Sequence, residues 1–322
     1  MVKIIKANEN SLEKAALIIR EGGLVAFPTE TVYGLGACAF NSTAVARIFE
    51  VKQRPRFDPI IVHIGDFKDI YKLCSEVNEK AELLIEKFWP GPLTLVLPKS
   101  NVIPDIVTAG LDTVAVRMPS HPIALKLIKK AEVPIAAPSA NLFGYLSPTT
   151  AEHVAEQLGD KIDLIIDGGK CPIGVESTVL DLTNEPTVLR LGGLPIEEIE
   201  KVIGKVKVLT LSEKPRSPGQ LPRHYSPRTP LKIIKENEEL TIQKNVRAGL
   251  LAFKQPKSKY KFLFKEIEVL SESGDLREAA CNLFSCLHKL DKAGLDVIYA
   301  EPVPEIGLGK AIMDRLRKAE VK

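Results

Sequence analysis

Short apolar runs of strand length alternate with segments of helical periodicity, and this alternation constrains the fold of the chain more than any other feature. The strand-like runs are Leu24–Phe27, Ile60–Ile64, Leu93–Leu97, Val114–Met118, Ile135–Ala137, Leu164–Ile166, Val179–Leu182 and Val188–Leu191. Helical patterns occur at Thr43–Glu50, Asn78–Phe88, His121–Lys130 and Thr150–Leu158, and one more follows Ser11, a candidate N-cap. This mixture predicts an α/β domain with a twisted, mixed sheet and flanking helices.

A proline-rich segment separates this region from the rest of the chain. Five prolines fall between residues 211 and 230, a composition typical of an extended, fairly stiff linker. Beyond it, strand-like runs at Leu231–Ile234, Gly249–Phe253, Ile267–Leu270 and Val297–Ala300 alternate with helical patterns at Leu276–Leu290 and Gly309–Ala319. We therefore expect a first domain over residues 1–210, a linker over 211–230 and a smaller, Rossmann-like α/β domain over 231–322.

Composition places the chain among ordinary globular proteins. Of its 322 residues, 45% are hydrophobic and 26% are charged, which excludes a disordered chain. A net charge of +3 is too small for a protein that coats nucleic acid, so any anion site must be local. We find no signal peptide or membrane span and expect a cytoplasmic location. The five cysteines never form a CxxC pair, which predicts reduced, mostly buried thiols.

The stretch Glu50–Pro59, EVKQRPRFDP, is the most basic candidate for such a site. In an extended chain Lys52, Arg54 and Arg56 would point to one side, and the proline after Arg54 disfavours a helix there. Taken alone, the stretch is more typical of a solvated basic turn than of a cradle for a polyanion. Its surroundings must decide between the two.

Polar side chains also gather at the ends of several strand-like runs. Thr31 lies in the loop Pro28–Gly36, although it could simply cap a turn, and His63 could be a core histidine with one hydrogen bond. The further candidates are Arg117, Ala137–Asn141, Ser147, Ser177 and Arg190, of which Ser147 could instead cap a helix. Ligand crevices form at such strand margins in α/β domains.

Several common catalytic signatures are missing from the sequence. It contains no P-loop, no HExxH and no GxSxG motif, so it offers no support for nucleotide binding by a Walker loop, zinc catalysis or a serine nucleophile. Catalysis by positioning and charge neutralisation remains. The residues therefore indicate an anion-binding enzyme.

The motifs together resemble those of the Sua5/YrdC family of threonylcarbamoyl-AMP synthases over nearly the whole chain. In the family's order they are FPTETVYGLG, KQRPRFDPIIVHI, FWPGPLTLVL, VAVRMPSHP, APSANLFGYLSPTTAEHV and GVESTVLDL. The linker SPGQLPRHYSP and the stretch EPVPEIGLGKAIMDRLRKA are similar to the longer Sua5 form, which implies a YrdC-like catalytic domain followed by a Sua5-type C-terminal domain.

The resemblance implies a reaction and its partners. The family makes L-threonylcarbamoyl-AMP from L-threonine, bicarbonate or CO2, and ATP, releases pyrophosphate, and so begins the formation of N6-threonylcarbamoyladenosine in tRNA. This implies Mg²⁺ held by the ATP phosphates, with no metal site in the protein. It also implies tRNA and a downstream threonylcarbamoyl transferase as further partners, a monomer, and no membrane.

The resemblance also assigns roles to individual residues. The signature Lys-x-Arg with Ser-x-Asn falls on Lys52, Arg54, Ser139 and Asn141, with Lys52 and Arg54 as the catalytic clamp on the polyphosphate. Threonine would be held by Thr31, His63, Arg117, Ala137 and Ser177, and its carboxylate would pair with Arg117. ATP would contact Lys52, Arg54, Asp58, Thr113, Ser139, Asn141, Ser147, Arg190, His224 and Tyr225, with Tyr225 covering the nucleotide.

One position departs from the family pattern. Asp58 stands where members usually have asparagine. A carboxylate would repel phosphate, but it could accept a hydrogen bond from the adenine amino group or help to bind magnesium. Arg56, in contrast, is expected to be a solvated charge.

Two other functions fit parts of the sequence. An inactive module that binds tRNA or double-stranded RNA would share the fold, although the balanced charge and the lack of interleaved aromatic and basic residues count against it. A carbamoyl-transferring maturation protein would carry paired CxxC motifs, which this chain lacks.

Overall fold

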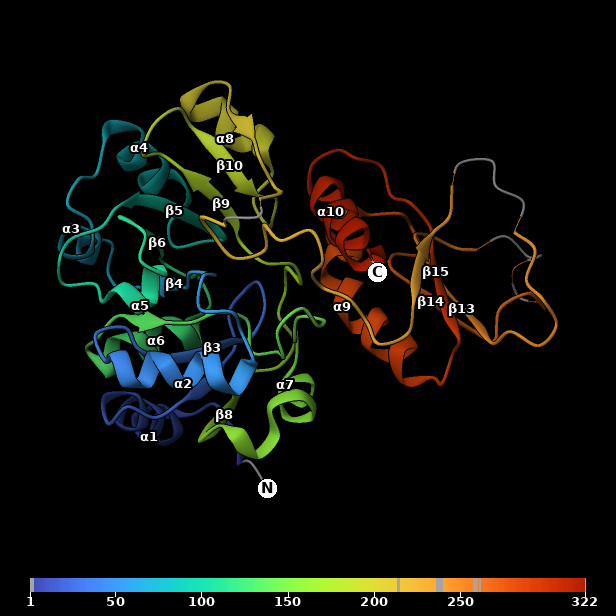
Figure 1. Ribbon diagram of the computed structural model, residues 1–322, viewed down its shortest axis with the longest axis horizontal. Coiled ribbons are helices and arrows are strands. Elements are labelled where there is room, and N and C mark those ends of the chain that lie inside the picture. The colour runs from blue at the N-terminus through green and yellow to red at the C-terminus, as the bar shows by residue number, and fades with distance from the viewer. Residues whose placement is uncertain (1–2, 213–214, 236–239, 257–259, 261, 322) are drawn as a thin grey trace.

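Two sheets organise the protein. The computed structural model describes residues 3–212, 215–235, 240–256, 260 and 262–321. Figure 1 shows the larger sheet and its helices on one side of the molecule and the smaller sheet on the other, with α9 (Leu276–Lys292) and α10 (Leu308–Glu320) between them. The predicted class, α/β with a large mixed sheet and a second, smaller unit, is confirmed.

The large sheet has eleven strands in the order β1-β8-β2-β3-β7-β4-β6-β5-β9-β10-β11. The strands are β1 (Ile4–Lys6), β2 (Val25–Phe27), β3 (Gly34–Cys38), β4 (Ile61–His63), β5 (Leu93–Pro98), β6 (Thr113–Arg117), β7 (Ile135–Ala136), β8 (Leu164–Asp167), β9 (Thr178–Asp181), β10 (Thr187–Arg190) and β11 (Lys207–Val208). Parallel β4 and β6 pair in a register that sets His63 beside Arg117. Residues paired in this way point to the same face of a sheet, so two candidate side chains emerge together.

Helices cover both faces of this sheet. They are α1 (Glu9–Arg20), α2 (Ser42–Lys52), α3 (Ile70–Leu73), α4 (Glu79–Phe88), α5 (Asp105–Thr108), α6 (Pro122–Ala131), α7 (Ala151–Leu158) and α8 (Ile196–Ile203), with 3-10 turns at Phe67–Asp69 and Gly159–Lys161. Along β2, Val25 and Phe27 belong to the core cluster that includes side chains of α1 and α6, whereas Ala26 belongs to the cluster that includes side chains of α2, α4 and α7. Successive side chains of one strand thus contribute to two hydrophobic cores, one on each face of the sheet.

The smaller sheet is fully parallel, in the order β12-β15-β13-β14. Its strands are β12 (Leu231–Ile233), β13 (Ala248–Ala252), β14 (Glu266–Val269) and β15 (Val297–Ala300). Every strand-like run that the sequence placed beyond the linker forms one of these strands. Residues 209–230, of which 213 and 214 lie outside the described residues, connect the two sheets.

A single apolar cluster joins the two units. From the first unit it includes Val32, Leu146 and Val175, and from the connection it includes Tyr225. These residues pack with side chains of α9 and α10, such as Phe284 and Leu316. The C-terminal helices therefore bury part of the first unit's surface.

Two local expectations need correction. Asn8 caps α1, and Ser11 is the third helical residue, which completes a reciprocal capping box. Lys52 ends α2 as a helical residue, and the left-handed Gln53 follows (φ 54°), so Lys52, Arg54 and Arg56 do not share one side of an extended chain. Instead Lys52 and Arg54 are buried, and Arg56 is exposed as expected.

The remaining global expectations concern cysteines and membranes. All five cysteines are free thiols, and every one except the half-buried Cys281 is buried, as predicted. Within the described residues, no helix combines the length and the apolar character needed to cross a bilayer.

Candidate active site

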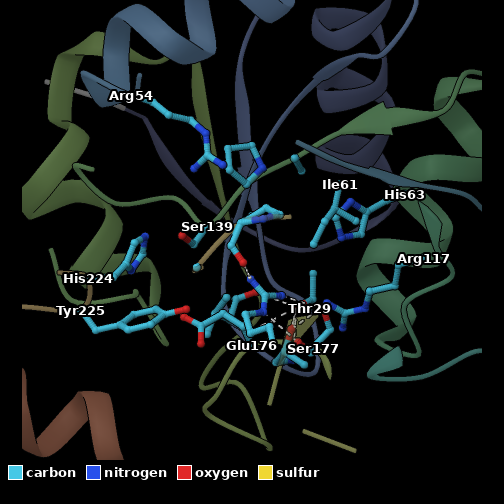
Figure 2. A pocket seen from close by; sticks show the side chains of 18 residues that line it. Thr29, Arg54, Ile61, His63, Arg117, Ser139, Glu176, Ser177, His224 and Tyr225 are labelled. Atoms are coloured by element: carbon cyan, nitrogen blue, oxygen red, sulfur yellow. Dashed lines mark hydrogen bonds between the residues drawn. The ribbon is translucent and has the colours of Figure 1, made fainter. Parts of the chain in front are cut away.

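One cavity collects most of the residues that the sequence singled out. It has a volume of about 40 Å³, and its walls come from the ends and beginnings of several strands and from the connection between the sheets. Ten predicted residues line it: Thr31, Arg54, His63, Arg117, Ala137, Ser139, Ser177, Arg190, His224 and Tyr225. Figure 2 shows Arg54, Arg117 and Tyr225 entering it from three different directions.

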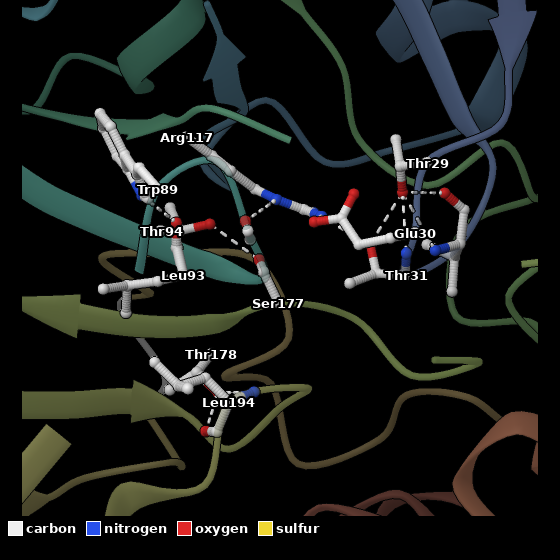
Figure 3. A network of polar contacts seen from close by, with 12 residues as sticks. Thr29, Glu30, Thr31, Trp89, Leu93, Thr94, Arg117, Ser177, Thr178 and Leu194 are labelled. Carbon is white, nitrogen blue, oxygen red and sulfur yellow. Dashed lines mark hydrogen bonds and ion pairs between the residues drawn. The ribbon is translucent and has the colours of Figure 1, made fainter. Parts of the chain in front are cut away.

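Arg117 is held in a buried network at one end of the cavity. Its Nη1 donates to Thr31 Oγ1 at 3.0 Å, and its Nη2 forms a 2.6 Å ion pair with Glu30. Thr29 Oγ1 lies 2.9 Å from Thr31 Oγ1 and accepts from the backbone NH of Thr31, which fixes the loop after β2. Figure 3 shows this chain of contacts from Thr29 to Arg117. The guanidinium is therefore oriented before any ligand binds.

Arg190 and Ser177 form the adjacent wall. Arg190 donates from Nε to the Ser177 carbonyl at 3.0 Å and from Nη2 to Ser177 Oγ at 2.9 Å. Ser177 Oγ also lies 2.7 Å from Thr94 Oγ1 of β5. Since all three side chains are buried, these bonds hold a second guanidinium rigidly.

His63 supplies a neutral imidazole. It is 4% exposed, and its Nδ1 has no hydrogen-bond partner. Burial, with the nearby charge of Arg117 as a smaller cause, lowers the pKa of His63 to about 3. At neutral pH the ring therefore carries no charge and keeps hydrogen-bonding capacity for a ligand.

Arg54 brings a third guanidinium together with its own carboxylate. Its Nη2 lies 2.9 Å from Asp58 Oδ2 and donates to the Pro59 carbonyl, and its Nε donates to the Asp58 carbonyl. Asp58 is fully buried and does not line the cavity. Burial raises the pKa of Asp58, and the charges of Arg54 and Lys52 oppose this rise. The carboxylate thus lies behind Arg54 and balances its charge.

Lys52 also lies behind the cavity wall. Its ammonium donates to the carbonyls of Ser139 and Asn141, the former at 2.6 Å, and it is 1% exposed. These bonds tie the end of α2 to the loop after β7. Burial, followed by the charge of Arg54, moves the pKa of Lys52 well below its ordinary value.

Three other predicted residues do not line the cavity. Asn141 bonds the backbone of its own loop, and Ser147 donates its hydroxyl to Glu176. Thr113 begins β6, whereas Arg117 ends it. The structure therefore brings ten of the fifteen predicted residues to the cavity and leaves Lys52, Asp58, Thr113, Asn141 and Ser147 outside its lining.

The connection between the sheets closes the remaining side. Tyr225 is buried, its hydroxyl has no hydrogen-bond partner, and its backbone has a left-handed φ of 58°. Such a conformation costs a non-glycine residue of order 1–3 kcal/mol. His224 packs edge-on against Phe143 at 5.7 Å, and Arg54 lies 5.8 Å from the same ring. The connection is thus fitted against the residues that flank Arg54.

Sequence reasoning missed two buried carboxylates, Glu30 and Glu176. Glu30 pairs with Arg117, and Glu176 lines the cavity and pairs with Arg315 of α10. Each stands one residue before a predicted site residue, Thr31 and Ser177. A buried cation needs a partner, and this requirement of the predicted arginines was the only available signal for either carboxylate.

The geometry restricts what the site can bind. Three fixed guanidinium groups surround one small cavity and favour anionic groups such as carboxylates or phosphates. No side chain is arranged as an activated nucleophile, and no group of three or more histidine, cysteine or acidic side chains that could hold a metal occurs among the described residues. The site is therefore suited to orienting reactants and neutralising their charge.

Two family models together match most of the chain. One, described as telomere recombination and covering the Sua5, YciO and YrdC proteins, matches residues 17–192. The other, described as the C-terminal domain of threonylcarbamoyl-AMP synthase, matches residues 194–320. The chain belongs to the Sua5/YrdC family.

Full-length relatives of this Sua5/YrdC chain carry one enzyme name. A threonylcarbamoyl-AMP synthase of Pyrococcus abyssi is 51% identical over 98% of this chain and 95% of its own length. The synthase of Bacillus subtilis is 45% identical, covering 98% and 94%, and that of Schizosaccharomyces pombe is 39% identical, covering 96% and 88%. The chain is therefore an enzyme of this family.

Solved structures agree with both units of the fold. The crystal structure of P. abyssi Sua5 complexed with L-threonine has a TM-score of 0.91 and 46% identity, and the match covers 99% of this chain and 97% of that one. Escherichia coli YciO matches with a TM-score of 0.54 and 26% identity, covering 60% of this chain and 96% of its own. The likeness to P. abyssi Sua5 thus extends over the C-terminal unit.

Proposed function

We propose that this protein makes L-threonylcarbamoyl-AMP from L-threonine, bicarbonate or CO2, and ATP, and so begins N6-threonylcarbamoyladenosine formation in tRNA. The observation that carries the proposal is the convergence of Arg54, Arg117 and Arg190 on one cavity. A reaction between a carboxylate-bearing amino acid and a triphosphate requires several fixed cations and no protein nucleophile. The names of the full-length relatives and the threonine complex of P. abyssi Sua5 support the same reaction.

Threonine would occupy the Arg117 end of the cavity. The guanidinium would pair with its carboxylate, and the hydroxyl of Thr31 and the unpartnered Nδ1 of His63 are polar groups that could meet its amino or hydroxyl group. Glu30 keeps Arg117 oriented through the 2.6 Å ion pair. The neutral imidazole avoids a second positive charge beside the ammonium group of threonine.

ATP would occupy the side of Arg54, Arg190 and the linker. The threonine nitrogen first bonds to the carbon of CO2 and loses a proton, which gives a carbamate. A carbamate oxygen then bonds to the α-phosphorus, the bond from that phosphorus to the bridging oxygen breaks, and pyrophosphate leaves with the electron pair. Arg54 and Arg190 would neutralise the charge that shifts onto the phosphate oxygens. Lys52 would act from behind, because it fixes the loop that carries Ser139.

Magnesium would arrive with the nucleotide. Asp58 is committed to Arg54, and the described residues contain no acidic cluster that could hold the ion. The ATP phosphates would therefore be its principal ligands, and the bound ion would reduce their charge.

The linker must move for ATP to enter. Sites for ligands of this size usually enclose about 300–1,000 Å³, whereas the cavity between the strands and the linker holds about 40 Å³. The linker contributes Pro218, Gly219, His224 and Tyr225 to the wall of this cavity, so a displaced linker would enlarge it. We therefore propose that this segment opens for substrates and closes for chemistry.

The decisive experiment measures pyrophosphate release and identifies the nucleotide product. Release should require ATP, threonine and bicarbonate together, and the product should be threonylcarbamoyl-AMP. Arg54→Ala should lose most of this activity, and exposed Arg56→Ala should retain it. Salt-sensitive tRNA binding without any ATP-dependent product would instead indicate an RNA-binding module.

A further inference from the structure

Helix α10 of the C-terminal unit carries a group of buried charges that face the catalytic unit. Arg315 is 1% exposed, and Asp314 and Lys318 are also buried. Arg315 Nη1 donates to Asp314 at 2.7 Å, and Lys318 Nζ lies 2.9 Å from the other oxygen of that carboxylate. Desolvating so many charges is expensive, so their arrangement calls for an explanation beyond stability.

Arg315 reaches the catalytic unit through Glu176. Its Nε donates to Glu176 Oε2 at 2.8 Å. The other oxygen, Oε1, accepts the hydroxyl hydrogen of Ser147. Glu176 also lines the cavity and directly precedes Ser177. One guanidinium thus orients a carboxylate whose two oxygens are assigned to different partners.

The charge on Glu176 depends on this contact. Burial alone would raise the pKa of Glu176, but the guanidinium groups of Arg315 and Arg190 outweigh burial and leave its pKa below the ordinary value. The carboxylate therefore stays ionised and keeps Ser147 as a donor. Without Arg315, a buried carboxylate would lose its closest cation.

The same helix holds the linker. The guanidinium of Arg315 lies 4.7 Å from the centre of the Tyr225 ring, a distance at which a cation is attracted to an aromatic face. Lys318 Nζ donates to the Gly219 carbonyl at 2.8 Å, and the His224 backbone NH donates to the Lys318 carbonyl. Helix α10 therefore contacts the linker at Gly219 and again at His224 and Tyr225.

We propose that Arg315 is a positioning residue for ATP, acting from the C-terminal unit through two side chains of the site. Through Glu176 it fixes the Ser147 hydroxyl, and through its planar face it supports Tyr225 in the strained conformation that closes the cavity. The hydrogen bonds of Arg315 among the described residues go to Glu176 and Asp314, and none goes to a residue assigned to threonine. This inference rests on the proposed function, because it assigns these contacts to the nucleotide side of that reaction.

The test compares Arg315→Met and Arg315→Lys with Arg317→Met. Arg317 lies on the same helix two residues further on, but it is exposed and pairs with Glu305. Pyrophosphate release gives KM for ATP and for threonine, calorimetry gives ATP affinity without turnover, and thermal unfolding reports the fold. In both Arg315 variants KM for ATP and the dissociation constant for ATP should rise about tenfold or more, a factor that corresponds to ~1.4 kcal/mol. KM for threonine should stay near the parent value.

Lysine is informative because it keeps the positive charge and loses the planar face and the second donor. Arg317→Met should match the parent protein in every measurement. If Arg315→Met does not fold, Arg315→Lys and Glu176→Gln test the same contact from its two ends. Folded Arg315 variants with unchanged ATP affinity, or with equal losses for ATP and threonine, would overturn the proposal. Absence of threonine-dependent turnover in the parent protein would instead refute the proposed function, and the calorimetric comparison would still test Arg315.

Discussion

Replacing Gly219 by alanine should disable the closed linker without replacing any side chain of the site. Gly219 has φ of +86° and lines the cavity. An alanine Cβ there would lie 2.6 Å from the Tyr225 hydroxyl and 3.0 Å from Cδ of Arg190. Real Cβ atoms do not approach other atoms to 2.6 Å, so the linker, the tyrosine or both must shift.

The size of the effect has two parts. An L-residue in the left-handed region costs about 1–2 kcal/mol of folding free energy. The clash adds displacement of Tyr225, which is buried and packed against Arg315, and of Arg190, whose position depends on Ser177. A misplaced binding group of this kind lowers the rate by up to about 100-fold. We therefore expect kcat/KM for ATP to fall by about ten- to 100-fold.

Gly204→Ala provides the matched control. Gly204 is the C-cap that follows α8, with φ of +80°, and an alanine Cβ there would meet nothing within 4 Å. Both variants should lose unfolding free energy in urea denaturation, because each places an L-residue at a positive φ. The clash adds a further loss only in Gly219→Ala, and only that variant should lose activity in the pyrophosphate assay. Equal activity in the two variants would show that the contact with Tyr225 does not matter, and the account of the closed linker would then be wrong.

Three further outcomes follow from buried ionisable side chains. Arg117→Lys should raise KM for threonine by about tenfold or more, because lysine cannot form a bidentate pair with the threonine carboxylate. The affinity for ATP in calorimetry should stay unchanged. A parallel loss of affinity for both substrates would contradict the assignment of Arg117. Asp58→Asn should lower the free energy of unfolding by a few kcal/mol, roughly the cost of breaking a buried ion pair. It should also enlarge the rise in unfolding temperature that ATP causes, because the ATP phosphates then supply the anionic partner that Arg54 has lost. An unchanged rise would count against this account. Burial lowers the pKa of His288 of α9 to about 3 in the folded protein. Below the ordinary histidine pKa, unfolding therefore takes up a proton at this residue. The free energy of unfolding should fall as the pH drops from about 6.5 towards 3, by at most ~1.4 kcal/mol per pH unit for this group. His288→Gln should flatten that slope in denaturation curves at several pH values, and an identical slope would exclude a contribution from this histidine.

Most of the fold was accessible from the sequence because strands and helices carry their own periodicity. Every predicted helix exists, because side-chain caps such as Asn78 and Thr150 mark the helix starts. The boundaries shift by at most two residues except at the start of α1, where the cap is Asn8 and not Ser11. The sequence did not predict β3, whose GLGAC segment contains two glycines and looks like part of a loop. Burial between two strands makes such a segment a strand, and that burial depends on tertiary context.

The candidate site was accessible where a residue follows a strand and inaccessible where two distant segments meet. Thr31 lies in the loop after β2, and His63 and Arg117 end β4 and β6. The sheet register brings the last two together. The contact of Arg315 with Glu176 joins residues 139 positions apart, and no local pattern can encode it. The position of Lys52 behind the wall likewise depends on how α2 meets the loop after β7.

The apolar cluster shared by the two units has a consequence for how the protein denatures. Val32, Leu146 and Val175 are buried in one cluster with side chains of α9 and α10. Separating the units would return this surface to water, so each unit's stability includes part of the other's. We expect one cooperative unfolding transition for the whole chain in calorimetry and not two. A version shortened to residues 1–210 would therefore confound lost chemistry with a damaged core, and point substitutions are the cleaner way to learn what the C-terminal unit contributes.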